Sequence, residues 1–213
     1  MAQPGLRERK KQATRRMIAD VATGLFVRRG FDAVTVAEIA EAAGVSKMTV
    51  FNYFPRKEDL YLDRHLDRLR ELEAVVRDRP AGEPVAVAMR RYHHELLAAG
   101  HPLSGAVEGV RGFWTVLHSS PALMSRMVEQ EHEIAKLLTR VLTEETGDEF
   151  QSRLVANLLT ATIITIWHTP VSRIVAGEDV ELVRREQVQV IDHAFDVLER
   201  GIGRRREPLH SGG

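Results

Sequence analysis

The sequence contains no cysteine, and only 6% of its 213 residues are aromatic. Without cysteine, neither a disulfide framework nor a thiol-ligated zinc site is possible, and the redox compartment cannot be inferred. No run of about 18 uninterrupted apolar residues occurs, and the N-terminal segment is charged where a signal peptide needs an apolar run. We therefore expect a cytoplasmic protein that does not associate with membranes.

Enzyme motifs are also missing. The sequence has no HExxH zinc motif, no glycine-rich phosphate loop and no Gly-x-Ser-x-Gly elbow. Of its nine histidines, His93 and His94 stand beside Glu95, but adjacent residues of a helix point about 100° apart and cannot easily hold one metal. We expect no catalysis, no metal site and no cofactor. The composition, 44% hydrophobic and 28% charged, is ordinary for a globular chain of one or two domains with a sizeable core.

Residues 35–57 read TVAEIAEAAGVSKMTVFNYFPRK, a pattern typical of two short helices joined by a glycine turn. Thr35 is placed to cap the first helix, which ends at Ala43 because Gly44 can adopt the left-handed conformation. Ser46 is placed to cap the second helix, and Pro55 ends it. The inward residues follow helical spacing: Val36, Ile39, Ala40, Ala43, Val50 and Phe54. The stretch therefore predicts a helix-turn-helix.

The outward face of the second helix combines a cation, polar tips and apolar groups, which suits phosphates, base edges and thymine methyl groups in a DNA groove. The candidate DNA-binding residues of the hairpin are Thr35, Ser46, Lys47, Met48, Thr49, Phe51, Asn52 and Tyr53. The alternative is a short helical hairpin inside another all-helical protein, with Lys47 and Asn52 merely solvated.

Charge is divided unevenly along the chain, although the formal net charge is zero. Residues 1–57 hold 11 Lys or Arg against 5 Asp or Glu, and residues 58–213 hold 19 against 25. A basic module beside an acidic body is expected of a DNA-binding protein, because neutralising phosphates supplies much of the affinity. The charge pattern therefore favours the DNA-binding interpretation of the hairpin.

The run from Thr14 to Tyr61, TRRMIADVATGLFVRRGFDAVTVAEIAEAAGVSKMTVFNYFPRKEDLY, resembles the N-terminal domain of the TetR family of bacterial transcriptional regulators. The matching motifs are Phe-x-x-x-Gly-Phe, Thr-x-x-x-Ile-Ala, the Gly-Val-Ser turn, an aromatic-rich recognition helix and Phe-Pro-x-Lys-Glu-x-Leu. The family usually has tyrosine where Phe51 stands, so contact with thymine methyl groups becomes more favourable here than a phenolic contact. Beyond residue 61 only the length and the helical character match the family.

The resemblance implies an all-α fold, with a three-helix helix-turn-helix DNA-binding domain at residues 1–56 and a helical effector-binding and dimerisation domain at 57–213. It also implies that the start of the first helix contacts DNA phosphates, which suits Lys10, Thr14 and Arg15, and that Lys57 contacts a phosphate. The alternatives are a flexible basic tail and an ordinary surface lysine.

About nine helices are predicted in total. Besides the two of the hairpin, they cover 7–29, 57–77, 83–99, 103–118, 121–147, a segment from 148, and 179–201. The segment from 148 contains LVANLLTATIITIWHTPV, which is apolar on nearly every face and must be covered on all sides. Pro170 should kink or break it. Ile202 extends the apolar stripe of the last helix. We expect a homodimer paired through these last two long helices, and the alternative is one larger core that buries both.

The resemblance further implies a small-molecule effector of unknown identity that binds in the body and releases a double-stranded DNA operator. Candidate effector-binding residues are Tyr92, His93, Phe113, Trp114, His118, Met127, Thr162, Ile166 and Trp167, with Met124 and His168 beside them. The alternative for each is packing in the core. The most favoured function is a ligand-responsive repressor. The alternatives are a helical protein-interaction module and a regulator of another helix-turn-helix family that has no small-molecule ligand.

Overall fold

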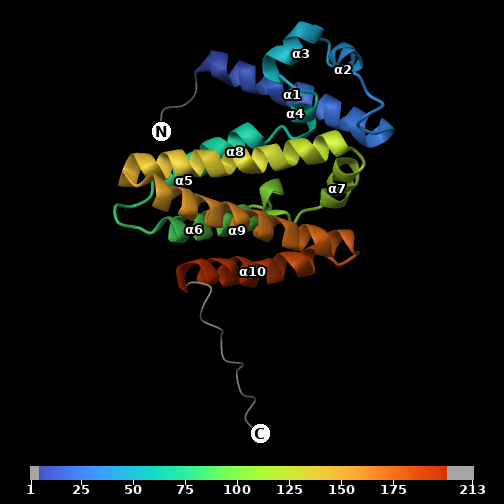
Figure 1. The fold of residues 1–213 in the computed structure, drawn as a ribbon. Helices are drawn as coiled ribbons and strands as arrows, with labels where there is room; N and C mark the ends of the chain where they lie inside the picture. Colours follow the sequence, from blue (N-terminus) through green and yellow to red (C-terminus); the bar gives the residue numbers. More distant parts are fainter. Residues whose placement is uncertain (1–4, 201–213) are drawn as a thin grey trace. The chain divides into compact units, whose positions relative to one another are not determined.

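The computed structural model of the protein describes residues 5–200 (Figure 1). This part of the chain contains ten α-helices, one 3₁₀ helix and no strand, which confirms the predicted all-α fold. The elements are α1 (Leu6–Arg29), α2 (Val36–Ala42), α3 (Lys47–Tyr53), α4 (Glu58–Tyr61), α5 (His65–Arg77), α6 (Val85–Ala98), the 3₁₀ helix η1 (Pro102–Ser104), α7 (Val110–His118), α8 (Pro121–Thr146), α9 (Glu149–Val175) and α10 (Val180–Arg200).

The chain forms two compact units. The first consists of the chain up to Leu69 together with Arg111–His132, and the second consists of Arg70–Val110 together with the chain from Glu133 onward. Helices α5 and α8 each contribute residues to both units. The functional division into residues 1–56 and 57–213 stays a prediction, because these units are defined by packing alone.

Helix α1 supplies the central packing surface of the first unit, where it contacts α2 and α4 (Figure 1). Ile18, Ala22 and Phe26 recur every four residues along it and have no exposed surface, as expected for one face of a helix. The helix ends where the backbone amide of Gly30 donates to the Phe26 carbonyl at 2.8 Å. Phe31 then turns back so that its ring lies 4.9 Å from the ring of Phe26.

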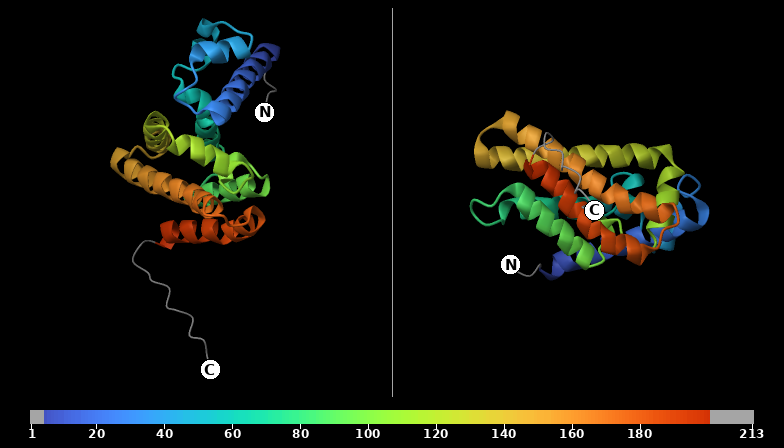
Figure 2. Two further views of the ribbon diagram at one scale, coloured as in Figure 1. Left: turned by 90° about the vertical axis from the view of Figure 1, so that its right-hand side faces the viewer. Right: turned by 90° about the horizontal axis from the view of Figure 1, so that it is seen from below.

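Helix α10 packs against both α6 and α9 in the second unit (Figure 2). Ile163, Ile191 and Phe195 are among the buried residues of this packing. The loop after η1 also approaches α9 closely at Gly105, where an added Cβ would lie 2.7 Å from the Trp167 carbonyl oxygen. Gly105 also has a φ of +75°, so both its backbone conformation and this contact require glycine.

The predicted helix over 57–77 is wrong as a single element, since it is divided into α4 and α5. Leu62 leaves the helical region with φ −94° and ψ 39°. Its carbonyl accepts from Gln130 Nε2 at 3.4 Å, and the Asp63 carbonyl accepts from Arg15 Nη2 at 2.6 Å. Distant side chains therefore satisfy the backbone at the break, and no proline or glycine marks it in the sequence.

The predicted helix over 103–118 is also wrong at its start. Only Pro102–Ser104 and Val110–His118 are helical, and Gly105 and Gly109 between them have φ values of +75° and +84°. An α-helix cannot pass through positive φ. The close approach of Gly105 to α9 supplies the physical reason for the turn.

Pro170 does not end α9, which continues to Val175. A proline has no N–H, so the carbonyl four residues earlier loses its helical donor. That carbonyl belongs to Ile166, and it accepts a hydrogen bond from Gln187 Nε2 on α10 at 2.8 Å. Gln187 is only 1% exposed, which places this replacement bond inside the core. The prediction that the helix could end early at Pro170 is therefore wrong.

The remaining helix predictions agree with the structure to within a few residues. Pro121 begins α8, and the Asp148 side chain caps α9 by accepting from the Gln151 amide at 2.9 Å. The predicted end of the last helix at Gly201 and the packing of Ile202 lie outside the described residues.

Helix α9 is long and apolar enough to cross a membrane by the criteria of length and composition. The core helix of a soluble protein meets the same criteria, and nine residues of α9 are buried within this structure.

The bond between Gln187 and Ile166 predicts an energetic coupling with Pro170. Gln187→Met should lower the free energy of unfolding by about 1–3 kcal/mol less in a Pro170→Ala background than in the wild type. The alanine amide of the Pro170→Ala protein can satisfy the Ile166 carbonyl in place of Gln187. The loss of Gln187 Oε1, which has no hydrogen-bond partner in the described residues, contributes equally in both backgrounds. Urea unfolding of the four proteins measures the coupling. Additive effects would contradict the assignment.

Candidate nucleic-acid interface

Helix α2 begins with a capping box. The Thr35 hydroxyl accepts from the Glu38 amide at 3.2 Å, and the Glu38 carboxylate accepts from the Thr35 amide at 2.7 Å. The same carboxylate accepts from Arg29 Nη2 at 2.7 Å. Hydrogen bonds from the Thr35 amide and then from Arg29 lower the pKa of Glu38 to about 2. The start of α2 is thereby attached to the end of α1.

The turn between α2 and α3 follows the predicted geometry. Gly44 has a φ of +64°, and the Val45 amide donates back to the Ala40 carbonyl at 3.0 Å. Ala40 is 4% exposed, so its small side chain lies in the packed part of the hairpin. The Ser46 hydroxyl then accepts from the Thr49 amide at 3.0 Å and caps α3. Each of these residues therefore sets the backbone of the hairpin.

Helix α3 has one buried face and one exposed face. Val50 and Phe54, four residues apart, are each 1% exposed. On the other face Met48 is 69% exposed and Phe51 is 40% exposed. The Lys47 ammonium lies 5.9 Å from the centre of the Phe51 ring. Lys47 and Asn52 are also exposed, so these four predicted DNA-binding side chains share the solvent face of a helix that is fixed from behind.

Several predicted DNA-binding residues have a structural role in addition. The hydroxyls of Thr35, Ser46 and Thr49 bond within the caps, and the Thr14 hydroxyl donates to the Lys10 carbonyl at 3.0 Å. Tyr53 is partly buried against the core of the first unit. Their contacts with DNA stay a prediction.

Lys57 is bound more closely to the protein than expected for a surface lysine. Its ammonium donates to the Phe31 carbonyl at 2.6 Å and lies 4.2 Å from the centre of the Phe31 ring. Burial lowers the pKa of Lys57. An ammonium has three N–H groups, so this hydrogen bond leaves donors for a phosphate. The phosphate contact stays a prediction, and the anchoring of the loop after α1 is an additional role that the sequence did not reveal.

Arg15 is another residue whose role depends on the tertiary structure. Its guanidinium lies 4.7 Å from the centre of the Phe54 ring and donates to the Asp63 carbonyl. Arg15 thereby connects α1 to the ends of α3 and α4. In the sequence it is only one of several cations in a basic run, so no local signal distinguishes it.

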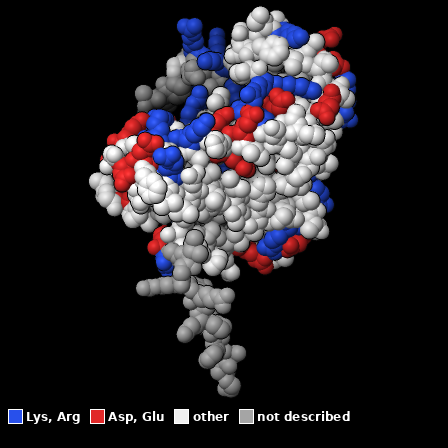
Figure 3. Space-filling view, in the orientation of Figure 1, with Lys and Arg blue, Asp and Glu red and all other residues white. Residues whose placement is uncertain are grey.

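The surface of the first unit carries many basic side chains. Figure 3 shows Lys and Arg side chains along α1, with Asp and Glu side chains among them and few charged side chains over the helix-turn-helix on this face. Lys10, Lys11, Arg16 and Lys47 of the first unit are exposed. A cationic surface next to an exposed helix can attract a nucleic acid and keep it close.

The predicted effector-binding residues are distributed over both units. Phe113, Trp114, His118 and Met127 belong to the first unit, and Tyr92, His93, Thr162, Ile166 and Trp167 to the second. Phe113, Trp114 and Met127, with Met124, pack against the hydrophobic core of the first unit. His93 is 5% exposed and bonds through Nδ1 to the Met89 carbonyl at 2.8 Å. His118 is exposed. Their role in binding an effector stays a prediction.

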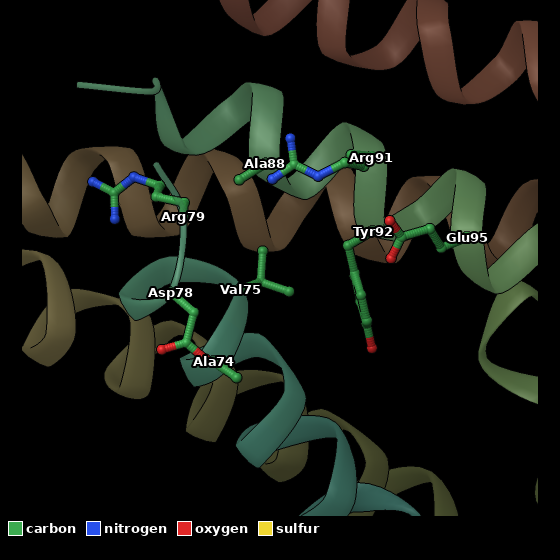
Figure 4. A pocket seen from close by; sticks show the side chains of 8 residues that line it. All are labelled: Ala74, Val75, Asp78, Arg79, Ala88, Arg91, Tyr92 and Glu95. Atoms are coloured by element: carbon green, nitrogen blue, oxygen red, sulfur yellow. The ribbon is translucent and has the colours of Figure 1, made fainter. Parts of the chain in front are cut away.

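A small pocket lies between α5 and α6 in the second unit (Figure 4). Its volume is about 180 Å³. Its lining residues are Ala74, Val75, Asp78, Arg79, Ala88, Arg91, Tyr92 and Glu95. Tyr92 extends from α6 toward α5, where its hydroxyl donates to Glu71 at 2.7 Å. Of these lining residues only Tyr92 is among the predicted effector-binding residues, and most of the others are charged or small.

Groups of three or more His, Asp or Glu side chains that could hold a metal ion do not occur in the described part of the chain.

Sequence comparison connects the helix-turn-helix with known regulators. Residues 18–63 match the profile described as "Bacterial regulatory proteins, tetR family". The chain is 30% identical over 167 residues to the HTH-type transcriptional regulator TcmR of Streptomyces glaucescens, covering 74% of this chain and 73% of that protein. It is 34% identical over 102 residues to the HTH-type transcriptional repressor LfrR of Mycolicibacterium smegmatis, covering 47% of this chain and 52% of that protein.

Solved structures share the fold over nearly the whole chain. Thermus thermophilus FadR, a TetR-family repressor in complex with lauroyl-CoA, has a TM-score of 0.52 and 24% identity, covering 93% of this chain and all of that chain. SmeT in complex with triclosan has a TM-score of 0.55 and 20% identity, covering 92% of this chain and 99% of that chain. The helix-turn-helix geometry, the matching profile and the similarity to TcmR lead to one conclusion: this chain belongs to the TetR family of bacterial transcriptional regulators.

Proposed function

We propose that this protein is a repressor that binds a palindromic DNA operator as a homodimer and is released by a small-molecule effector. The observation that carries the proposal is the solvent face of α3, which presents a cation, an amide and two apolar groups: Lys47, Asn52, Met48 and Phe51. A helix held by a buried face and exposed on the other can enter a major groove. The amide suits an adenine edge, and the apolar groups suit thymine methyls.

Phosphate contacts would fix the position of this helix on the duplex. Lys10 is exposed near the start of α1, and Lys57 keeps ammonium donors beside the helix-turn-helix. Such contacts add affinity but no base discrimination, and they weaken as salt rises. The basic surface of the first unit supports this division of roles. A repressor that acts on an operator works where the DNA is, so we assign it to the cytoplasm.

An apolar stripe on α9 supports the dimer. Phe150, Leu154 and Leu158 recur every four residues and are 73%, 47% and 41% exposed. Over the middle of α9, the face shown in Figure 3 carries few charged side chains. A two-fold axis would place the same stripe of a second copy against it, with Leu182, Val188 and Val197 of α10 as further exposed apolar residues. Two α3 helices about 34–36 Å apart could then enter successive major grooves.

The effector part of the proposal is supported by the neighbours of this fold. FadR and SmeT were solved with lauroyl-CoA and triclosan, which are small molecules with apolar parts. The predicted ligand residues of this chain are likewise mainly aromatic and aliphatic. Release would follow if the effector binds the DNA-incompetent conformation more tightly.

A second candidate is a regulator that has no small-molecule effector. The pocket between α5 and α6 is compatible with it, because its volume of about 180 Å³ is well below the about 300–1,000 Å³ of ordinary ligand sites and, of the predicted effector residues, only Tyr92 lines it.

Lys47 and Asn52 should contribute to DNA binding in different ways. Lys47→Ala should weaken binding to all duplexes and reduce the slope of log K against log salt by about 1, because one phosphate contact is lost. Asn52→Ala should cost about 1–3 kcal/mol on the selected operator and relax the preference at one base pair. Fluorescence anisotropy over a salt series measures both effects.

Lys136→Ala, an exposed lysine of the second unit, is the control and should leave operator binding unchanged. Circular dichroism should stay helical in every variant. If DNA binding by the wild type is absent even at low salt, the proposal is wrong.

If the exposed apolar stripe on α9 is the dimer interface, charged side chains introduced into it should separate the two protomers. Leu154→Glu together with Leu158→Glu should convert the dimer to a monomer in sedimentation velocity, because pairing would bury four carboxylates without partners. Operator affinity should fall about 100-fold or more, since the helix-turn-helix units of two protomers are no longer linked and cannot bind the operator together. Val128→Glu, at an apolar site on α8 that is even more exposed, should remain dimeric. A dimeric double variant would exclude this face as the interface.

Effector binding predicts that a small molecule accompanies the native protein. Native mass spectrometry of the purified protein should show a bound compound, and adding that compound back to stripped protein should lower operator affinity. Stripped protein that is indifferent to every compound recovered would favour the regulator without an effector.

A further inference from the structure

Three side chains from one part of α8 reach the backbone and side chains around α4. Arg126 Nε donates to Asp59 Oδ1 at 2.7 Å, and Gln130 Nε2 donates to the Leu62 carbonyl at 3.4 Å. Glu129 accepts from Arg56 at 2.5 Å. Arg126 also donates to Glu129 at 3.2 Å, so the contacts form one network. All of these residues belong to the first unit.

The network is partly shielded from water where it meets α4. The side chains of Arg126 and Asp59 are 12% and 17% exposed, and Gln130 is 8% exposed. A shielded charge pair is held more tightly than an exposed surface pair and is costly to break by removing one partner. The Glu129 and Arg56 side chains are about half exposed, at 45% and 54%. The Arg126–Asp59 pair is therefore the firmest polar contact between these two helices.

The position of α4 matters because it directly follows the recognition helix. Only Phe54, Pro55, Arg56 and Lys57 separate α3 from α4. Phe54 is buried and Lys57 is bonded to the Phe31 carbonyl, so the connection has little freedom. Tyr61, at the end of α4, stacks on Phe113 with ring centres 5.1 Å apart. Residues 111–132 therefore hold the element to which the recognition helix is attached.

We propose that Arg126 and Glu129 are positioning residues for DNA binding: through Asp59 and Arg56 they set the angle at which α3 enters the groove. The proposal rests on the proposed function. It makes the start of α8 a working part of the DNA-binding unit, although more than sixty residues of chain separate it from α3. Neither residue needs to touch DNA.

Asp59→Asn distinguishes a long-range charge effect from the proposed positioning role, because the two predict opposite changes in operator affinity. Removing a negative charge close to the recognition helix should strengthen binding to a polyanion if only long-range charge matters. If the Arg126–Asp59 pair sets the angle of α3, the same substitution should weaken binding to the operator. Arg126→Met should weaken it as well, and the double variant should bind no more weakly than Arg126→Met alone, because both substitutions remove the Arg126–Asp59 hydrogen bond.

The experiment compares the dissociation constant for an operator, selected by the wild type from random duplexes, with that for a scrambled duplex at the same salt. In Asp59→Asn and Arg126→Met we expect the preference for the operator over the scrambled duplex, given by the ratio of the two dissociation constants, to fall about 10-fold. Glu129→Gln, at a half-exposed site, should change the ratio in the same direction.

Arg77→Met and Glu144→Gln are the controls. This ion pair, 2.6 Å apart, joins α5 to α8 as a charged contact of α8, but it lies in the second unit. They should leave the ratio unchanged. An unchanged ratio in Glu129→Gln and in folded Asp59→Asn, checked by circular dichroism and thermal unfolding, would overturn the inference while DNA binding stands. A wild type that selects no operator would instead overturn the proposed function, and this inference with it.

Discussion

The recognition helix depends on the burial of its inward face. Seven residues are too few for a stable isolated helix in water, so α3 exists because tertiary packing holds it. Val50 and Phe54 lie in a core built around Ile18, Ala22 and Phe26 of α1. Burying large apolar side chains contributes about 1.5–3 kcal/mol each, which outweighs the modest propensity of the helix itself. The exposed face is then free to carry residues that the stability of the fold does not require.

Polar contacts add direction to this packing. Apolar burial has no preferred angle, whereas a hydrogen bond does. In the first unit, the Glu38 capping box joins α2 to Arg29 of α1, and Arg15 joins α1 to the segment after α4. Lys57 fixes the loop that follows α1. These bonds surround the hairpin, so the orientation of α3 is defined by several independent connections rather than by the core alone.

The second unit shows how a core accommodates irregular backbone. Pro170 removes a hydrogen bond from the middle of α9, and Gln187 of α10 replaces it. Gly105 lets a loop approach the Trp167 carbonyl, where no side chain would fit. Both features join α9 to its neighbours on one side and leave the stripe of Phe150, Leu154 and Leu158 exposed on another. A rigid helix with one unpaired apolar face is suited to pairing with a second copy.

The sequence by itself determined the helix-turn-helix, because caps, a positive-φ glycine and helical spacing are local signals: Thr35, Gly44, Ser46 and Pro55 act within a few residues of their own position. It also determined the family and, on the exposed face of α3, the positions of Lys47, Met48, Phe51 and Asn52, whereas Thr49 and Tyr53 are partly buried. Only the tertiary structure decided that 57–77 is two helices and that α9 continues through Pro170. It also decided that residues 111–132 pack in the first unit together with the helix-turn-helix. Those outcomes depend on Arg15, Gln130 and Gln187, whose partners lie far away in the chain, and no local pattern records a bond between residues that only folding brings together.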